Sequence, residues 1–549
     1  MKTREKKHSN FIVQGGILAM AGIISRIIGL LYRIPLQKTI GDSGMGYYSA
    51  AFQIYSIMLV ISSYSLPVAV SKLIAARVAR EQYRNAKRLY RCALVFSMIT
   101  GGLACLIVVF GADTLASDVM SLSRSAIALR ILAPALVIVA VMGVMRGFFQ
   151  GRGTMMPTAA SQLLEQLVNA VISVVMAVNM YAYGEKVAAL LRNKSFAPAY
   201  GAAGGTMGTL IGALAGLIFL VIIFLIHKSS YREAVEMDES EHVESYARIF
   251  KVLMLTILPV ILSSTIYNIS DVLDQGIFGK AMGRRGISEH DIATYWGIFS
   301  TKYKTIINVP VALANALCSS MMPSLTASIE RGDRRTARKK VRMGMRFVMI
   351  VAIPCAVGLA VLGEPILALL FSGDTKAAAM MLRVGSVSVV FYSMSTLSNG
   401  VLQGIDRMNV PVRNAAIALV LHGLVLYFTT AVMDLRLIGI VISIIVFSLT
   451  ICILNWFDIR RHLGYRQEIK RTFIIPLISS IIMGIICYLT YIIAIRFLGS
   501  GISCVIAVLV AVVVYVVALL LLKGIREKEL LAFPGGRIIA KIARFLHLM

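Results

Sequence analysis

Fourteen apolar stretches divide this 549-residue chain into segments long enough to cross a lipid bilayer. Charged residues, or Gly and Pro, separate the stretches, as expected at the ends of membrane helices. Because 58% of the residues are apolar and only 15% are charged, an ordinary soluble globular protein is excluded. The sequence predicts an all-α polytopic membrane protein with transmembrane helices at residues 11–37, 47–75, 90–110, 125–148, 158–181, 203–227, 251–278, 296–328, 346–371, 378–403, 411–432, 436–457, 473–496 and 502–522.

Lysine and arginine are distributed unevenly between alternate connections. With a cytoplasmic N-terminus, the inside segments hold 37 of these cations and the outside segments hold 11. Cytoplasmic loops of membrane proteins carry an excess of Lys and Arg, so this distribution predicts fourteen spans with both termini in the cytoplasm. It also accounts for the formal net charge of +28, so no nucleic acid partner is expected.

Part of the sequence repeats at an offset of 253 residues. The matching positions are Leu129-Arg130 with Leu382-Arg383, Gly147 with Gly400, and Gln150-Gly151 with Gln403-Gly404, while Pro157 and Pro411 match one residue out of register. A shift of six helices preserves orientation in the membrane, so the repeat is parallel. We expect two six-helix lobes around a central cleft (1–230 and 245–457), two further helices (472–523) and an amphipathic helix on the membrane surface (535–549).

Seven further cations, which are not counted with the connecting segments, lie inside or at the margins of the predicted spans, where a charge is costly. They are Arg26, Arg33, Lys72, Arg130, Lys302, Lys304 and Arg383. Arg26 and Arg33 are almost two helical turns apart, so both point from one face of the first helix. We expect them, with neighbouring Ser25, to line a wet cavity that binds an anion. The alternative for Arg33 and Lys72 is that each side chain extends to the lipid headgroups.

Three acids are also expected inside the membrane. Glu165 belongs to a polar stripe with Gln162 and Asn169 on the fifth helix, and Asp271 and Asp274 share a face of the seventh helix. Two roles remain open for these acids, namely neutralising the intramembrane cations or binding a coupling ion.

The sixth helix carries glycines at a strict four-residue spacing. They are Gly204, Gly208, Gly212 and Gly216. Such a ridge of small residues predicts that another helix approaches this one closely.

The sequence lacks the motifs of nucleotide and hydrolytic chemistry, G-x-x-x-x-G-K-[ST] and H-E-x-x-H. Its seven cysteines include no C-x-x-C and no metal-ligand spacing. We therefore predict a transporter, not an enzyme, without a metal or cofactor. Cationic side chains in a cavity favour a phosphate or pyrophosphate cargo, because arginine binds phosphate oxygens bidentately.

The first two spans resemble the start of the lipid II flippase family. The resemblance rests on GIISRIIGLLYR at residues 22–33, GDSGMGYY at residues 41–48 and Ser65-Leu66-Pro67. The two Gln-Gly turns followed by proline and the fourteen-span layout also match, and the chain looks closest to the branch that includes the stage V sporulation protein B group. The resemblance covers essentially the whole chain and places it in the superfamily of multidrug, oligosaccharidyl-lipid and polysaccharide exporters.

This resemblance implies translocation of lipid II, an undecaprenyl-pyrophosphate-linked peptidoglycan precursor, across the bacterial plasma membrane by alternating access. Arg26 and Arg33 would engage the pyrophosphate. The sequence departs from the family pattern in two ways. Arg33, the second arginine, lies one residue further along the chain than in the family. Where the family has arginines on its second and eighth helices, this chain has only lysines, namely Lys72 and either Lys302 or Lys304.

Three alternatives remain. The chain would carry another undecaprenyl-pyrophosphate-linked polysaccharide precursor, or act as a cation-coupled multidrug exporter using Glu165, Asp271 and Asp274, or serve as a scaffold that transports nothing. We expect a monomer among membrane lipids, with the cell-wall synthesis machinery as a partner.

Overall fold

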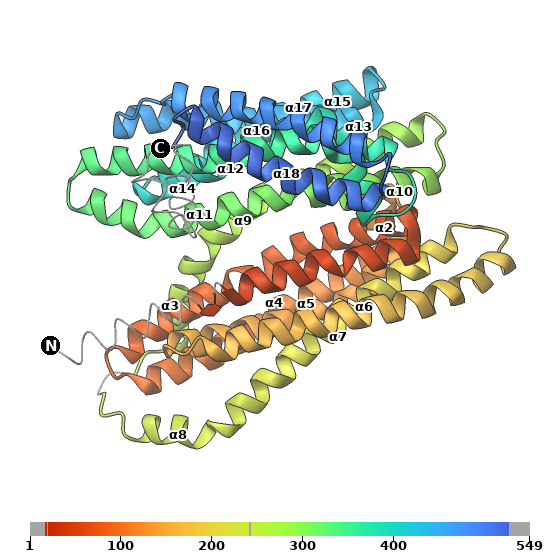
Figure 1. Ribbon diagram of the computed structural model, residues 1–549. Helices are drawn as coiled ribbons and strands as arrows, with labels where there is room; N and C mark the ends of the chain where they lie inside the picture. The colour runs from red at the N-terminus through yellow and green to blue at the C-terminus, as the bar shows by residue number, and fades with distance from the viewer. Residues whose placement is uncertain (1–16, 19, 241–242, 526–549) are drawn as a thin grey trace. The chain divides into compact units, whose positions relative to one another are not determined.

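The computed structural model describes residues 17–18, 20–240 and 243–525 as an assembly of helices (Figure 1). The chain divides into two compact units, Met1–Gly297 and Ile298–Met549. The expected N-terminal lobe ends at residue 230, so the first unit includes two helices, α9 and α10, that the sequence analysis assigned to the second lobe. The predicted amphipathic helix at residues 535–549 lies outside the described residues.

The helices of the first unit follow one another with short connections. They are Met20–Leu31, α2 (Arg33–Leu59), the π-helix η1 (Val60–Tyr64), α3 (Leu66–Val78), α4 (Tyr83–Thr114), the π-helix η2 (Leu115–Val119), α5 (Ser125–Gly151), α6 (Met156–Leu190), α7 (Phe196–Ile226), α8 (Lys228–Glu236), α9 (Tyr246–Arg284) and α10 (Glu289–Gly297).

The α2 range joins two helices at Gly41. The φ angle of Gly41 is +70°, which is accessible to glycine at little cost and breaks the helix between the first and second predicted spans. Further along α2, Gly46 approaches the backbone of Ala293 so closely that a Cβ atom would collide with it. This contact fixes α10 on α2 and explains why α10 belongs to the first unit.

The prediction of close packing along the glycine ridge is confirmed. On α7, Gly204 lies against the Met176 and Ala177 backbone and Gly212 lies against the Glu165 carbonyl of α6. Gly208 contacts Ser173 in the same way. The two helices therefore meet through backbone atoms, which holds α6 in a fixed position.

Polar contacts attach the start of α9 to the first unit. Glu244 pairs with Arg77 of α3, and its amide donates to Asn85 Oδ1 of α4 over 2.9 Å. The Asp238 carboxylate accepts the Arg84 amide over 2.5 Å. Burial opposes ionisation of Asp238, but hydrogen bonds from the Arg84 and Ser240 amides outweigh it and lower the pKa of Asp238 below its usual range.

The second unit contains the remaining helices. They are the π-helix η3 (Ile298–Tyr303), α11 (Lys304–Glu330), α12 (Arg334–Leu370), α13 (Lys376–Gly385), α14 (Val387–Gly404), α15 (Asn409–Tyr427), the π-helix η4 (Phe428–Val432), α16 (Arg436–Leu463), the π-helix η5 (Lys470–Ile474), α17 (Ile475–Ala494) and α18 (Ser500–Leu521). In this unit α14 packs against α11, α12 and α16, while α17 and α18 pack together beside α12.

Within the described residues, ten helices are long and apolar enough to cross a membrane. The number is eleven if α13 and α14, bent by 51°, form one span. Helices cover all fourteen predicted stretches wholly or in part. The polytopic helical fold is thus confirmed, while the count of fourteen spans and the cytoplasmic termini stay predictions.

The internal repeat has a structural counterpart in each unit. Gly147 of α5 lies against Pro67 of α3, and its repeat equivalent Gly400 of α14 lies against Cys318 of α11. Arg130 and its repeat equivalent Arg383 each form an ion pair with the preceding long helix: Arg130 with Asp113 at 2.5 Å, and Arg383 with Glu364 at 3.2 Å. Both arginines therefore have a local partner.

Candidate functional site

The arginines of the first predicted span lie on either side of a turn at Tyr32. In helix Met20–Leu31, Ser25 is buried and Arg26 is exposed. Arg33 begins α2, is half-buried, and has Tyr32 and Tyr48 as electrostatic partners. The hydroxyl oxygens of these two tyrosines are 3.0 Å apart. A guanidinium beside two hydroxyl groups offers several hydrogen-bond donors to an anion.

A third arginine of the first unit, Arg146, is held between α5 and α6. Its Nη2 atom is 2.8 Å from Glu165 Oε2, and its Nε atom donates to Ser161 Oγ over 3.1 Å. The side chains of Arg146 and Glu165 retain 16% and 17% of their exposure. Glu165 therefore has an ion-pair partner inside the first unit, and Tyr55 of α2 is an electrostatic neighbour of its carboxylate.

Helix Met20–Leu31 lies beside the same stretch of α6. A Cβ atom placed on Gly29 would be 3.8 Å from Gln166 Oε1, and Gln166 directly follows Glu165. Arg26 precedes Gly29 by about one helical turn. The first unit thus brings Arg26, Arg146 and Glu165 onto neighbouring helices.

The other predicted residues of the first unit lie on different helices. Lys72 of α3 is exposed, Asp271 of α9 is half-buried, and Asp274 is 3% exposed. Both aspartates have electrostatic or hydrogen-bond partners. An ion-coupling role for these acids, or for Glu165, stays a prediction.

The two lysines of the eighth predicted span belong to the second unit. Lys302 is fully buried in η3, and its Nζ atom donates to the Asp374 carbonyl over 2.9 Å. Lys304 begins α11 and is half-buried. Lys302 is therefore bound to the connection before α13, and its role in substrate binding stays a prediction.

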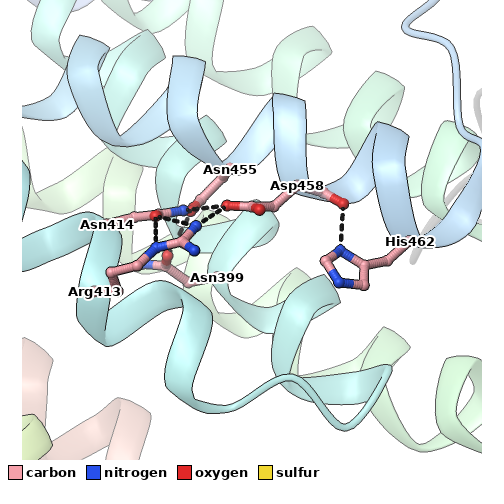
Figure 2. Close-up of polar contacts among 6 residues, drawn as sticks. All are labelled: Asn399, Arg413, Asn414, Asn455, Asp458 and His462. Carbon is pink, nitrogen blue, oxygen red and sulfur yellow. Dashed lines mark hydrogen bonds and ion pairs between the residues drawn. The ribbon is translucent and has the colours of Figure 1, made fainter.

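The second unit contains a polar network that joins α14, α15 and α16 (Figure 2). Asn455 donates to Asn399 Oδ1 over 2.8 Å and accepts from Asn414 over 2.9 Å. Asn414 also donates to Asp458, which pairs with Arg413 at 2.7 Å. Asn414 and Asn455 are fully buried, whereas the Arg413 side chain is 59% exposed.

Arg146 and the amide network were not predicted from the sequence. Arg146 is not among the seven cations expected in or beside the spans, although the predicted span runs to residue 148 and α5 runs to Gly151. The ion pair with Glu165 links two adjacent helices at positions 19 residues apart, so no single-helix pattern reveals it. The asparagines carry no formal charge, so they did not stand out from the apolar spans.

Two family models match the chain. The model described as "Polysaccharide biosynthesis protein" matches residues 13–329, which is more than half of the chain, and the MatE model matches residues 259–429. Both matched ranges begin in the first unit and end in the second.

Curated relatives match along most of the chain. "Lipid II flippase MurJ" of Bacillus subtilis (strain 168) is 26% identical over 85% of this chain and 86% of its own length. "Stage V sporulation protein B" of the same organism is 23% identical over 96% of this chain and 98% of its own length.

Solved structures show the same fold. An inward-facing multidrug resistance MATE family transporter of the MOP superfamily matches with a TM-score of 0.66 at 17% identity, covering 83% of this chain and 98% of the transporter. Lipid II flippase MurJ in its inward closed conformation matches with a TM-score of 0.64 at 16% identity, covering 91% and 97%. The relatives are membrane transporters and flippases rather than enzymes, and this chain is a multi-pass protein of the bacterial plasma membrane that belongs to the polysaccharide biosynthesis protein family.

Proposed function

We propose that this protein translocates lipid II across the plasma membrane by alternating access. The headgroup of lipid II would enter from the cytoplasm and bind Arg26, Arg33 and Ser25 of the first unit. Lys72 and Lys302 are further candidates for binding it. The isoprenoid tail would stay in lipid throughout. A monomer is the proposed transport unit.

The observation that carries this proposal is the cationic site on the first helices. Arg26 is exposed, Arg33 lies beside two tyrosine hydroxyls, and Arg146 is one helix away. A charge within a membrane span is costly, so two arginines seven residues apart in the first predicted span favour an anionic ligand. Similarity to a lipid II flippase over 85% of the chain supports a lipid-linked diphosphate as that ligand.

The direct test is translocation of fluorescent lipid II in proteoliposomes that contain the purified full-length protein. We expect Arg26→Ala to lower the flipping rate at least about tenfold, because a charge-assisted phosphate contact is lost. Arg383→Ala is the matched control, since Arg383 forms an exposed ion pair with Glu364 outside the proposed site. Equal rates for wild type and Arg26→Ala would contradict the proposed role of the first helix.

Other cargoes make separate predictions. Similarity to stage V sporulation protein B leaves room for another undecaprenyl-pyrophosphate-linked precursor. That other precursor would be favoured by two results together. The protein would fail to replace a lipid II flippase in a strain depleted of it, and it would still flip a lipid linked to another glycan.

The MATE fold supports a second candidate function, cation-coupled drug export using Glu165, Asp271 and Asp274. Resistance to cationic drugs on overexpression, lost in Asp274→Asn, would favour export over flipping. Drug sensitivity equal to that of cells without the protein would count against it.

A further inference from the structure

The Arg146–Glu165 pair is not fully buried. Both side chains keep about one sixth of their exposure, so the pair is partly accessible. Arg146 is also oriented by Ser161, through a hydrogen bond of 3.1 Å from Nε. The guanidinium would therefore remain positioned if a different anion replaced the carboxylate on its Nη atoms.

The internal repeat shows that a charge pair is not required at this point of the fold. At the 253-residue offset, Arg146 corresponds to Asn399, which joins a neutral amide network. In the register set by Pro157 and Pro411, Glu165 corresponds to Leu419. The first unit thus carries a cation and an acid where the second unit has an amide and an apolar side chain.

We propose that Arg146 is a third cation of the diphosphate site, held by Glu165 until the lipid-linked diphosphate binds, and that Glu165 takes up one proton when Arg146 changes partner. This inference rests on the proposed function and adds the uptake of one proton to each transport step. A diphosphate competes well for Arg146 because its oxygens match the planar guanidinium bidentately.

The proton follows from the surroundings of Glu165. Burial without a cationic partner disfavours the charged form of a carboxylate and favours its neutral form. Arg146 of α5 pairs with this carboxylate, and Tyr55 of α2 is an electrostatic neighbour of it. On α7, Gly212 lies against the backbone carbonyl of Glu165, and a Cβ atom on Gly216 would be 3.4 Å from Glu165 Cβ. Arg26, the charged residue of the adjacent helix, is committed to the diphosphate in this arrangement. One proton from bulk solvent completes the exchange, and no other reactant is needed.

The test is binding of undecaprenyl diphosphate to the full-length protein in nanodiscs, measured by calorimetry at pH 7 in buffers of different ionisation enthalpy. We expect Arg146→Gln to weaken binding at least about tenfold, because a bidentate phosphate contact is lost. Glu165→Gln should instead bind severalfold more tightly than wild type, since the competitor of the diphosphate is removed. Wild type should take up about one more proton per bound lipid than Glu165→Gln, which corrects for titration of the diphosphate itself.

If the ion pair is merely structural, Glu165→Gln should not bind the lipid more tightly than wild type. If the pair only holds α5 to α6, Glu165→Gln weakens binding or leaves it unchanged, and proton uptake equals that of wild type; either result overturns the inference. Asp458→Asn, in the second unit's network, is the matched control and should bind as wild type does.

The double variant Arg146→Asn/Glu165→Leu guards against misfolding of the single variants, because it installs the residues of the second unit. It should bind as weakly as Arg146→Gln and show no excess proton uptake, and wild-type affinity would overturn the inference. Absence of binding by wild type and all variants overturns the proposed function and this inference together, whereas binding without the predicted differences overturns this inference alone.

Discussion

The polar clusters of the two units occupy related positions but differ in chemistry. In the first unit, Arg146 and Glu165 form a charge pair between α5 and α6, and both remain partly exposed. In the second unit, Asn399 stands in place of Arg146, and the hydrogen bonds pass through Asn455 and Asn414 with no exposure at either residue. A fully satisfied amide network makes a rigid joint, whereas an accessible ion pair can exchange partners. The first unit thus has a partly exposed ion pair where the second has a buried neutral network, and in our proposal only the ion pair exchanges partners.

The largest effect is expected when the first cluster loses only its acid. Glu165→Leu leaves the Arg146 guanidinium without a counter-charge and should lower the free energy of unfolding by about 3 kcal/mol. Unfolding in detergent by titration with SDS measures this change. A loss below about 1 kcal/mol would mean that Arg146 finds another partner.

The amide network should be the next most sensitive place. Asn455→Leu leaves the side chains of Asn399 and Asn414 without their partner, so we expect a loss of about 2 kcal/mol. The same titration measures it, and lipid binding by the folded fraction should stay normal. Stability equal to wild type would show that the network is not a rigid joint.

The double variant Arg146→Asn/Glu165→Leu sharpens the comparison. Replacing both members of an ion pair by neutral groups is often nearly neutral, so stability should change by less than about 1 kcal/mol. The double variant should thus be more stable than Glu165→Leu alone. A loss equal to the sum of the single-variant losses would mean that the two side chains do not interact.

The exposed end of the second cluster should matter less. Because the Arg413 side chain is 59% exposed, its pair with Asp458 is screened by solvent, and Arg413→Gln should lower stability by at most about 1 kcal/mol. This difference should shrink further when unfolding is measured at high salt. A larger, salt-independent loss would show that Arg413 is essential to the amide network.

The smallest effect concerns acid sensitivity at the connection before α9. The pKa of Asp238 is lowered in the folded protein. Its contribution to stability is therefore complete above the ordinary aspartate pKa of about 4, and it is lost as the pH falls through the lowered pKa of the folded state. Asp238→Asn should therefore lower stability at pH 7 by up to about 1 kcal/mol and flatten the acid limb of a stability profile. Glu239→Gln, at an exposed neighbour, is the control and should leave the profile unchanged.

The sequence predicted the helices better than their partners. Apolar length located the spans, and the four-residue spacing of Gly204 and Gly208 predicted the close approach of α7 to its neighbour, because both signals are local to one helix. The Arg146–Glu165 pair depends on how α5 and α6 are rotated against each other, which no local pattern specifies. Lys302 was equally hard to place, since the Asp374 carbonyl that accepts its hydrogen bond is a backbone group and carries no sequence signal.

The glycine ridge of α7 has a consequence for where a lipid chain can pass. Backbone contacts at Gly204, Gly208 and Gly212 leave no room for an acyl or isoprenoid chain between α6 and α7. This seam is therefore closed to hydrocarbon along much of its length. The tail of a cargo anchored in the bilayer therefore cannot pass between α6 and α7 at these glycines.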